Sequence, residues 1–245
     1  MSKAKAKWIA GVDGCRSGWL AVLRDPAGDR PPQLKHYRRF ADILEAPEAP
    51  DPIAVDMPIG LPERIDGPGR APEKLVRPLL GARQSSVFSI PARAAVLCED
   101  YREACRIAAR HSNPPKRVSK QAFNIFPKIC EIDALITPRL CTRIFEVHPE
   151  VAFWRLNGGQ PMSLPKKVKS RGNPDGLEER RRLLERLGYA PSFLTQATPP
   201  GAGADDLLDA CVCALIAGRL ANGLACPMPD PPERDARGIA IAIWS

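Results

Sequence analysis

The sequence is poor in aromatic residues and histidine, and it lacks any paired cysteine motif. Aromatic side chains make up 6% of the 245 residues, and there are three histidines and eight cysteines. No two cysteines have the C-x-x-C spacing of common zinc sites, so we do not expect bound zinc. Because unpaired, scattered cysteines are typical of a reducing compartment, we expect all eight thiols to be reduced.

Long apolar segments are missing as well. No stretch approaches the roughly 18 consecutive apolar residues of a membrane span. The basic N-terminus leads into strand-like sequence, without the apolar core of a signal peptide. We therefore expect a cytoplasmic protein with no membrane partner. Hydrophobic residues at 44% and charged residues at 26% are normal for a globular protein, and the length suits one α/β domain over residues 1–245.

The first quarter of the chain has the pattern of a three-stranded meander followed by a helix and a fourth strand. Two apolar runs at 8–14 and 18–23 are joined by a short turn, which predicts a hairpin. A third strand is expected at 33–40, a short helix at 41–46, and another strand at 53–56.

The remainder is predicted to be mostly helical. An insertion over about 60–142 contains a helix at 99–110 and a second at 119–136, which Pro127 should break. A strand at 143–147 follows. A basic loop at 160–175 then precedes the last helices and a final strand, and we expect Arg180–Arg182 to lie largely outside. These later elements are a helix at 176–187, a buried helix at 205–220 and a strand at 238–244.

Acidic residues occur where these strands end and where the buried helix begins. Asp13, Asp56 and Glu146 each close a predicted strand, and Asp206 and Asp209 share one face of the late helix. Carboxylates among apolar neighbours are costly unless they are paired or bound to a cation. A hard divalent cation such as Mg²⁺ or Mn²⁺ removes their mutual repulsion and can activate water. We therefore expect Asp13, Asp56 and Asp206 or Asp209 to lie within roughly 8 Å of one another as metal ligands.

Each acidic residue also has a structural alternative. Asp13 followed by glycine is a common turn, and Asp56 before Met-Pro could simply end a strand. Glu146 is a candidate ligand or base, but it could instead pair with an arginine. Asp205 stands where the helix cap is expected, so we predict capping for it.

The order of strands and helices resembles the RNase H fold, in which carboxylates on the first strand, the fourth strand and the last helix hold the metals. The segment 206–210 (DLLDA) also resembles the end-helix motif of RuvC-type resolvases. The chain as a whole resembles domain-of-unknown-function family 429, whose members are regarded as nucleases of the RNase H-like superfamily. The matching segments are 11–19 (GVDGCRSGW), 55–60 (VDMPIG), 83–88 (RQSSVF), 121–129 (QAFNIFPKI), 145–150 (FEVHPE) and 205–210 (DDLLDA). The resemblance implies an RNase H-like mixed sheet flanked by helices, with Asp13, Asp56, Asp206 and Asp209 as metal ligands.

Several basic and hydroxyl side chains are candidates for binding substrate phosphates. The net charge of +8 suits a polyanion such as nucleic acid, although many proteins without such a partner share it. Guanidinium, ammonium and hydroxyl groups are the usual phosphate donors. His148 could also transfer a proton or orient a water. The candidates are Arg16, Arg83, Ser85, Ser86, Arg93, His148, Lys166 and Lys167.

These features favour a Mg²⁺- or Mn²⁺-dependent nuclease, and two other functions compete with it. The glycine-rich segment 11–18 also resembles the first phosphate loop of the actin-like ATPase superfamily, which would make the protein a phosphotransferase. The second phosphate loop of that superfamily has only a poor counterpart at 56–60, and its adenosine motif is not evident. The other competitor is a non-catalytic nucleic-acid-binding protein, on which metal would have no effect.

Overall fold

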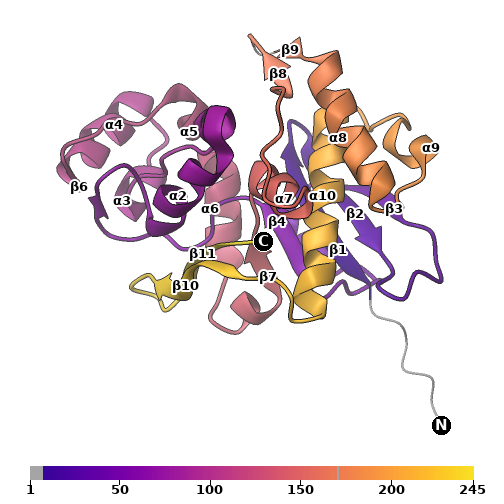
Figure 1. Cartoon of the computed structure of the whole chain (residues 1–245). Coiled ribbons are helices and arrows are strands. Elements are labelled where there is room, and N and C mark those ends of the chain that lie inside the picture. The colour runs from indigo at the N-terminus through magenta and orange to yellow at the C-terminus, as the bar shows by residue number, and fades with distance from the viewer. Residues whose placement is uncertain (1–7, 170) are drawn as a thin grey trace.

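The computed structural model describes residues 8–169 and 171–245, and its centre is a five-stranded mixed sheet (Figure 1). The strands lie in the order β3-β2-β1-β4-β7. Strand β2 is antiparallel to both β1 and β3, whereas β4 is parallel to both β1 and β7. Their bounds are β1 Ile9–Cys15, β2 Gly18–Arg24, β3 Gln33–Tyr37, β4 Ile53–Asp56 and β7 Ile144–Glu146. The predicted α/β fold with a mixed sheet flanked by helices is confirmed.

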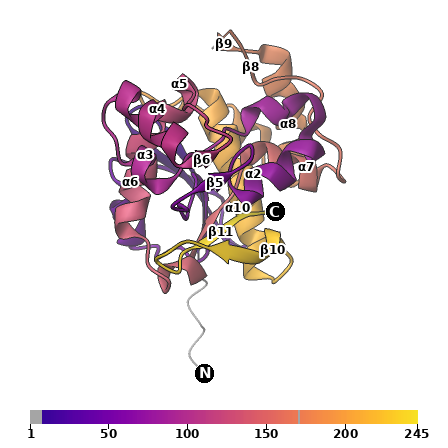
Figure 2. The same cartoon turned by 90° about the vertical axis from the view of Figure 1, so that its left-hand side faces the viewer.

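Between β4 and β7 the chain is mainly helical, where the insertion was expected. These helices lie beside the sheet in Figure 1 and face the viewer in Figure 2. The predicted helix at 119–136 is interrupted at Ile125, next to Pro127. The elements are β5 (Ile65–Asp66), α2 (Ala71–Val76), a 3₁₀ segment (Arg77–Ser86), α3 (Arg93–Val96), α4 (Tyr101–Arg110), β6 (Ser112–Asn113), α5 (Lys120–Asn124), α6 (Phe126–Leu135) and a 3₁₀ turn (Leu140–Thr142).

The two faces of the sheet support separate cores because side chains alternate along each strand. Val12 and Ala21 belong to the core formed with α1 (Phe40–Leu44) and α6. Leu20 and Val22 belong to the core formed with α10 (Ala204–Ala221). The helices on the α10 side also include α7 (Pro149–Leu156), α8 (Pro174–Arg186) and α9 (Pro191–Leu194).

Helix α10 lies directly against β1, and a glycine makes this approach possible. A Cβ atom at Gly11 would lie 2.0 Å from the backbone nitrogen of Ala214 and 2.1 Å from the carbonyl oxygen of Ala210. No side chain fits in that space, so Gly11 fixes how closely the helix and the strand approach. The N-terminal turns of α10 are thereby brought to the ends of β1 and β4.

Several predictions about the C-terminal part need correction. Arg180 was expected outside but is 1% exposed, because its Nη2 donates to Oε1 of Glu150 at 2.5 Å. The final strand, β11 (Ala240–Trp244), pairs with the unpredicted β10 (Pro227–Arg234) and not with the central sheet. The sequence did not predict β10, because its prolines lack the backbone N–H groups with which a regular strand pairs. The basic loop contains a short hairpin, β8 (Lys167–Val168) and β9 (Arg171–Gly172).

Two further features bear on the expectations from composition. All eight cysteines are free thiols. Over the described residues, none of the helices is long and apolar enough to cross a membrane.

Candidate metal centre

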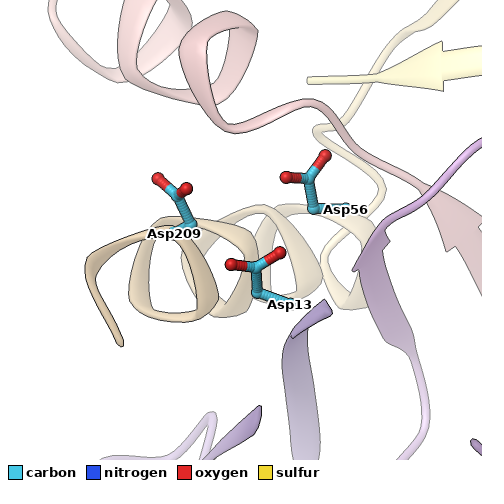
Figure 3. A group of neighbouring side chains, drawn as sticks. All are labelled: Asp13, Asp56 and Asp209. Carbon is cyan, nitrogen blue, oxygen red and sulfur yellow. The ribbon is translucent and has the colours of Figure 1, made fainter. Parts of the chain in front are cut away.

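Three aspartates from separate elements converge at the carboxyl-terminal ends of the inner strands β1 and β4 (Figure 3). Asp13 is near the end of β1, Asp56 is the last residue of β4, and Asp209 lies in the second turn of α10. The first two are paired in the parallel register of β1 and β4. One carboxylate oxygen from each residue lies within 4.8 Å of the others, so the predicted convergence is confirmed.

This cluster is withdrawn from solvent and rich in negative charge. Asp13 is 6% exposed and Asp209 is 1% exposed, while Asp56 is half-buried. Burial, followed by the charges of Asp56 and Asp209, raises the pKa of Asp13 well above its usual range. Burial and the charge of Asp209 raise the pKa of Asp56 to about 8. The three carboxylates therefore resist being charged together.

Lys166 supplies the nearest positive charge. Its Nζ forms an ion pair with Oδ2 of Asp209. Burial alone would lower the pKa of Lys166, but the charges of Asp209, Asp13 and Asp56 outweigh it and raise that pKa. The pKa of Asp209 still rises to about 6, because burial outweighs the opposing effect of Lys166. Its Oδ1 is buried and has no hydrogen-bond partner in the described structure.

The neighbouring acidic residues of α10 have other contacts. Oδ2 of Asp206 accepts a hydrogen bond from the backbone N–H of Gly203 at 2.8 Å, which helps to cap the helix. Asp205 pairs with Lys167 at 2.5 Å. The cap residue is Gly203, so the prediction that Asp205 caps α10 is wrong. Asp209 therefore joins the cluster, and Asp206 lines the same cavity without joining it.

Glu146 holds the insertion to the sheet. Its Oε1 accepts from Nη2 of Arg70 at 2.6 Å, and its Oε2 accepts from the backbone N–H of Ile59 at 2.7 Å. Arg70 also bonds Glu73 at 2.7 Å, and all three side chains are buried. Both oxygens of Glu146 thus accept hydrogen bonds, so the structural alternative of pairing with an arginine applies, and Glu146 lies outside the aspartate cluster.

His148 lies in the same cavity as the aspartates. Its Nε2 donates to the carbonyl oxygen of Ser86 at 3.3 Å, and its Nδ1 is buried without a partner among the described residues. Burial lowers the pKa of His148 to about 4. The ring is therefore neutral at pH 7, and its Nδ1 can accept a hydrogen bond from a water.

The cavity at the aspartates measures about 440 Å³. Its lining includes some of the predicted phosphate contacts, namely Arg16, Ser86, Lys166 and Lys167. Arg83 and Ser85 do not belong to this lining, and Ser85 faces a neighbouring cavity instead.

Arg93 is also outside the cavity lining. Its guanidinium forms ion pairs with Asp133 and, at 2.7 Å, with Asp235. The contact with Asp235 fastens the insertion to the β10–β11 hairpin, whereas Asp133 belongs to the insertion itself. The guanidinium is already satisfied by carboxylates, so the expected phosphate contact is not available to Arg93.

Lys128 and Glu150 are among the cavity residues that were absent from the predicted site. Lys128 lines the cavity, and its Nζ donates to the carbonyl oxygen of Gly18 at 2.6 Å. Glu150 lines it too, and its Oε2 is buried with no partner in the described residues. Both stand in segments that carry the family resemblance, but helical periodicity gives no indication that they face the sheet edge.

Fold and site together define an α/β protein with a buried aspartate cluster at the edge of a mixed sheet. Residues 11–234 match the model of the family described as "Protein of unknown function (DUF429)", and the chain belongs to this family. Neither the curated proteins nor the solved structures contain a match to the chain.

Proposed function

We propose that the protein is a Mg²⁺- or Mn²⁺-dependent hydrolase of phosphodiester bonds in nucleic acid. The observation that carries the proposal is the convergence of Asp13, Asp56 and Asp209 within 4.8 Å. All three donors are carboxylate oxygens, which suit hard cations such as Mg²⁺ and Mn²⁺ better than zinc or copper. The unpartnered Oδ1 of Asp209 is a buried acceptor that such a cation would satisfy.

A divalent ion held by these aspartates would supply an activated water and stabilise negative charge on a phosphate. The remaining steps use the protein's own side chains. Lys166 pairs with Asp209, and a cation bound to that carboxylate would release the ammonium group to bind a phosphate. Lys128 and Arg16 line the same cavity and add positive charge for substrate binding. The neutral His148 offers its Nδ1 to orient a water.

Two further features support this proposal. The cluster draws its carboxylates from β1, β4 and the long helix α10, which are the positions that the resemblance to the RNase H fold implies. The net charge of +8 favours a polyanionic substrate. We also propose a cytoplasmic location, since eight free thiols suit a reducing compartment.

The test is cleavage of single-stranded, duplex and branched DNA and RNA, with and without Mn²⁺. We expect cleavage only with the metal and its loss in Asp13→Asn. Asp29→Asn makes the same chemical change at an exposed position and should leave cleavage intact. Absence of cleavage on every substrate, with no effect of Mn²⁺ on the protein, would favour the non-catalytic nucleic-acid-binding alternative.

A further inference from the structure

The helical insertion carries most of the net positive charge. Residues 60–142 contain 14 Lys and Arg against 8 Asp and Glu, so a third of the chain holds six of the eight net charges. Several of its acidic side chains are already paired with arginines. These pairs are Arg70–Glu73, Arg93–Asp133 and Arg106–Glu103. The surplus positive charge of the insertion therefore resides on the basic residues outside these pairs.

Two cavities of the insertion lie in a row beside the candidate metal centre, each sharing lining residues with the one before it. A cavity of about 500 Å³ shares Phe88 and Ile90 with the cavity at the aspartates. A third cavity, of about 600 Å³, shares Arg117 with the second. We name these two cavities the insertion track, which runs from Phe88 at the metal centre to Arg110 on α4.

The lining of the insertion track is basic and hydroxyl-rich. Lys116 and Arg117 are exposed, and no ion pair involving either occurs in the described part of the chain. Arg102 and Arg110 line the far cavity. Ammonium and guanidinium groups without carboxylate partners are available to phosphates, whose neutralisation dominates the affinity of proteins for nucleic acid.

Two aromatic side chains line the insertion track, and Nζ of Lys120 lies over the ring of one of them, Tyr101, at 3.6 Å from its centroid. Phe88 stands where the track meets the metal centre, and Tyr101 lines the far cavity; both are half-buried. A basic groove with interspersed aromatic side chains is the usual surface for single-stranded nucleic acid, because unpaired bases can stack on the rings.

We propose that the insertion track binds the backbone of a single-stranded nucleic acid that extends from the candidate metal centre. The inference rests on the proposed function for the class of substrate. Lys116 and Arg117 hold successive phosphates at the junction of the two cavities. The charge of the insertion thus serves strand binding, whereas the aspartates serve the cation.

The test is fluorescence anisotropy with labelled 20-nucleotide oligo-dT and oligo-U in EDTA, over a series of salt concentrations. For Lys116→Ala/Arg117→Ala we expect affinity at low salt to fall about ten-fold, and the slope of log K against log[salt] to decrease by about 1.4, as for two lost phosphate contacts. The control Arg182→Ala/Arg186→Ala removes two exposed charges from α8 and should leave both quantities unchanged. An unchanged salt slope in the first variant, or a duplex bound as tightly as the single strand, would overturn the proposal.

Melting curves and cleavage assays separate this inference from the nuclease proposal. Both double variants should melt at the wild-type temperature, because the four side chains are exposed. Strand binding that depends on Lys116 and Arg117, without cleavage in Mn²⁺, would retain the insertion track and reject the nuclease. Cleavage in Mn²⁺, with the salt slope unchanged in the Lys116→Ala/Arg117→Ala variant, would support the nuclease and reject strand binding by the insertion track.

Discussion

Among single residues, substitution of Asp13 by asparagine distinguishes a metal site from a structural salt bridge. Its Oδ1 accepts a hydrogen bond from the N–H of Gly14 at 2.7 Å, an interaction that the amide oxygen of asparagine can preserve. Asp13→Asn therefore removes charge repulsion with little loss of structure. We predict that the metal-free variant is more stable than wild type by about 1 kcal/mol.

The same substitution should weaken stabilisation by metal. At Mn²⁺ about 100 times its Kd the wild-type protein gains about 2.7 kcal/mol, and the variant should gain clearly less. Thermal melts in EDTA and in Mn²⁺ measure both effects. A destabilised metal-free variant, together with a wild-type melt that Mn²⁺ does not change, would indicate a structural salt bridge.

Lys166→Met should produce the opposite change. The substitution leaves Asp209 without its ion-pair partner, so we expect the metal-free protein to lose about 1–3 kcal/mol. It also removes the competitor for that carboxylate, so the Kd for Mn²⁺ should fall about ten-fold. Calorimetric titration checks the affinity. Lys167→Met is the matched control, because its partner Asp205 lies outside the cluster; equal affinities in the two variants would contradict this role of Lys166.

The raised pKa of Asp56 predicts how stability changes with pH. The folded protein holds a proton on this carboxyl up to about pH 8, whereas the unfolded chain releases it near pH 4. The folded state therefore binds more protons, and stability falls as pH rises towards 8. His148 acts in the opposite direction between about pH 4 and 6.5, because its folded pKa of about 4 is lowered.

The informative window is therefore pH 6.5–8. In EDTA we expect Tm to decrease across this range, because the free energy of unfolding falls by up to about 1.4 kcal/mol per pH unit for each extra proton bound by the folded state. Saturating Mn²⁺ should remove the decrease, since the metal replaces the protons. A Tm of the metal-free protein that rises or stays level over this window would show that the folded state does not hold extra protons on these aspartates.

At the scale of elements, the contact between β1 and α10 positions the third carboxylate. Gly11→Ala would place a Cβ 2.0 Å from the backbone of Ala214, which forces α10 away from the strand. We predict a loss of about 1–3 kcal/mol and weaker Mn²⁺ binding, because Asp209 moves with the helix.

Gly218→Ala is the control within the same helix. Its Cβ would meet Cδ1 of Ile9 at an ordinary 3.5 Å, so the substitution should stabilise α10 by up to about 1 kcal/mol. Urea denaturation of both variants measures the difference. Equal stabilities would mean that Gly11 does not set the distance between helix and strand.

Local pattern accounts for the elements that the sequence predicted well. The apolar runs of β1, β2 and β4 and the apolar surface of α10 are continuous in sequence, so Asp13, Asp56 and Asp209 could be placed at their ends. Pairings between distant segments were beyond such patterns. The bond of Glu146 to Arg70 and that of Arg93 to Asp235 join residues 76 and 142 positions apart, and no periodicity reports them.

At the scale of the whole molecule, charge is divided between two regions. Negative charge gathers at the edge of the central sheet, and surplus positive charge lies in the insertion beside it. Such a division suits a protein that holds a cation in one place and a polyanion in another. Composition predicted the basic surplus, but only the fold shows that it borders the aspartates.

Under the proposed function, Asp13, Asp56 and Asp209 together hold a divalent cation. Crystals grown with Mn²⁺ test this through the anomalous scattering of the ion. We predict an anomalous peak in contact with all three carboxylates, with Nζ of Lys166 moved away from Asp209. No peak at millimolar Mn²⁺, with Lys166 still paired to Asp209, would contradict the claim.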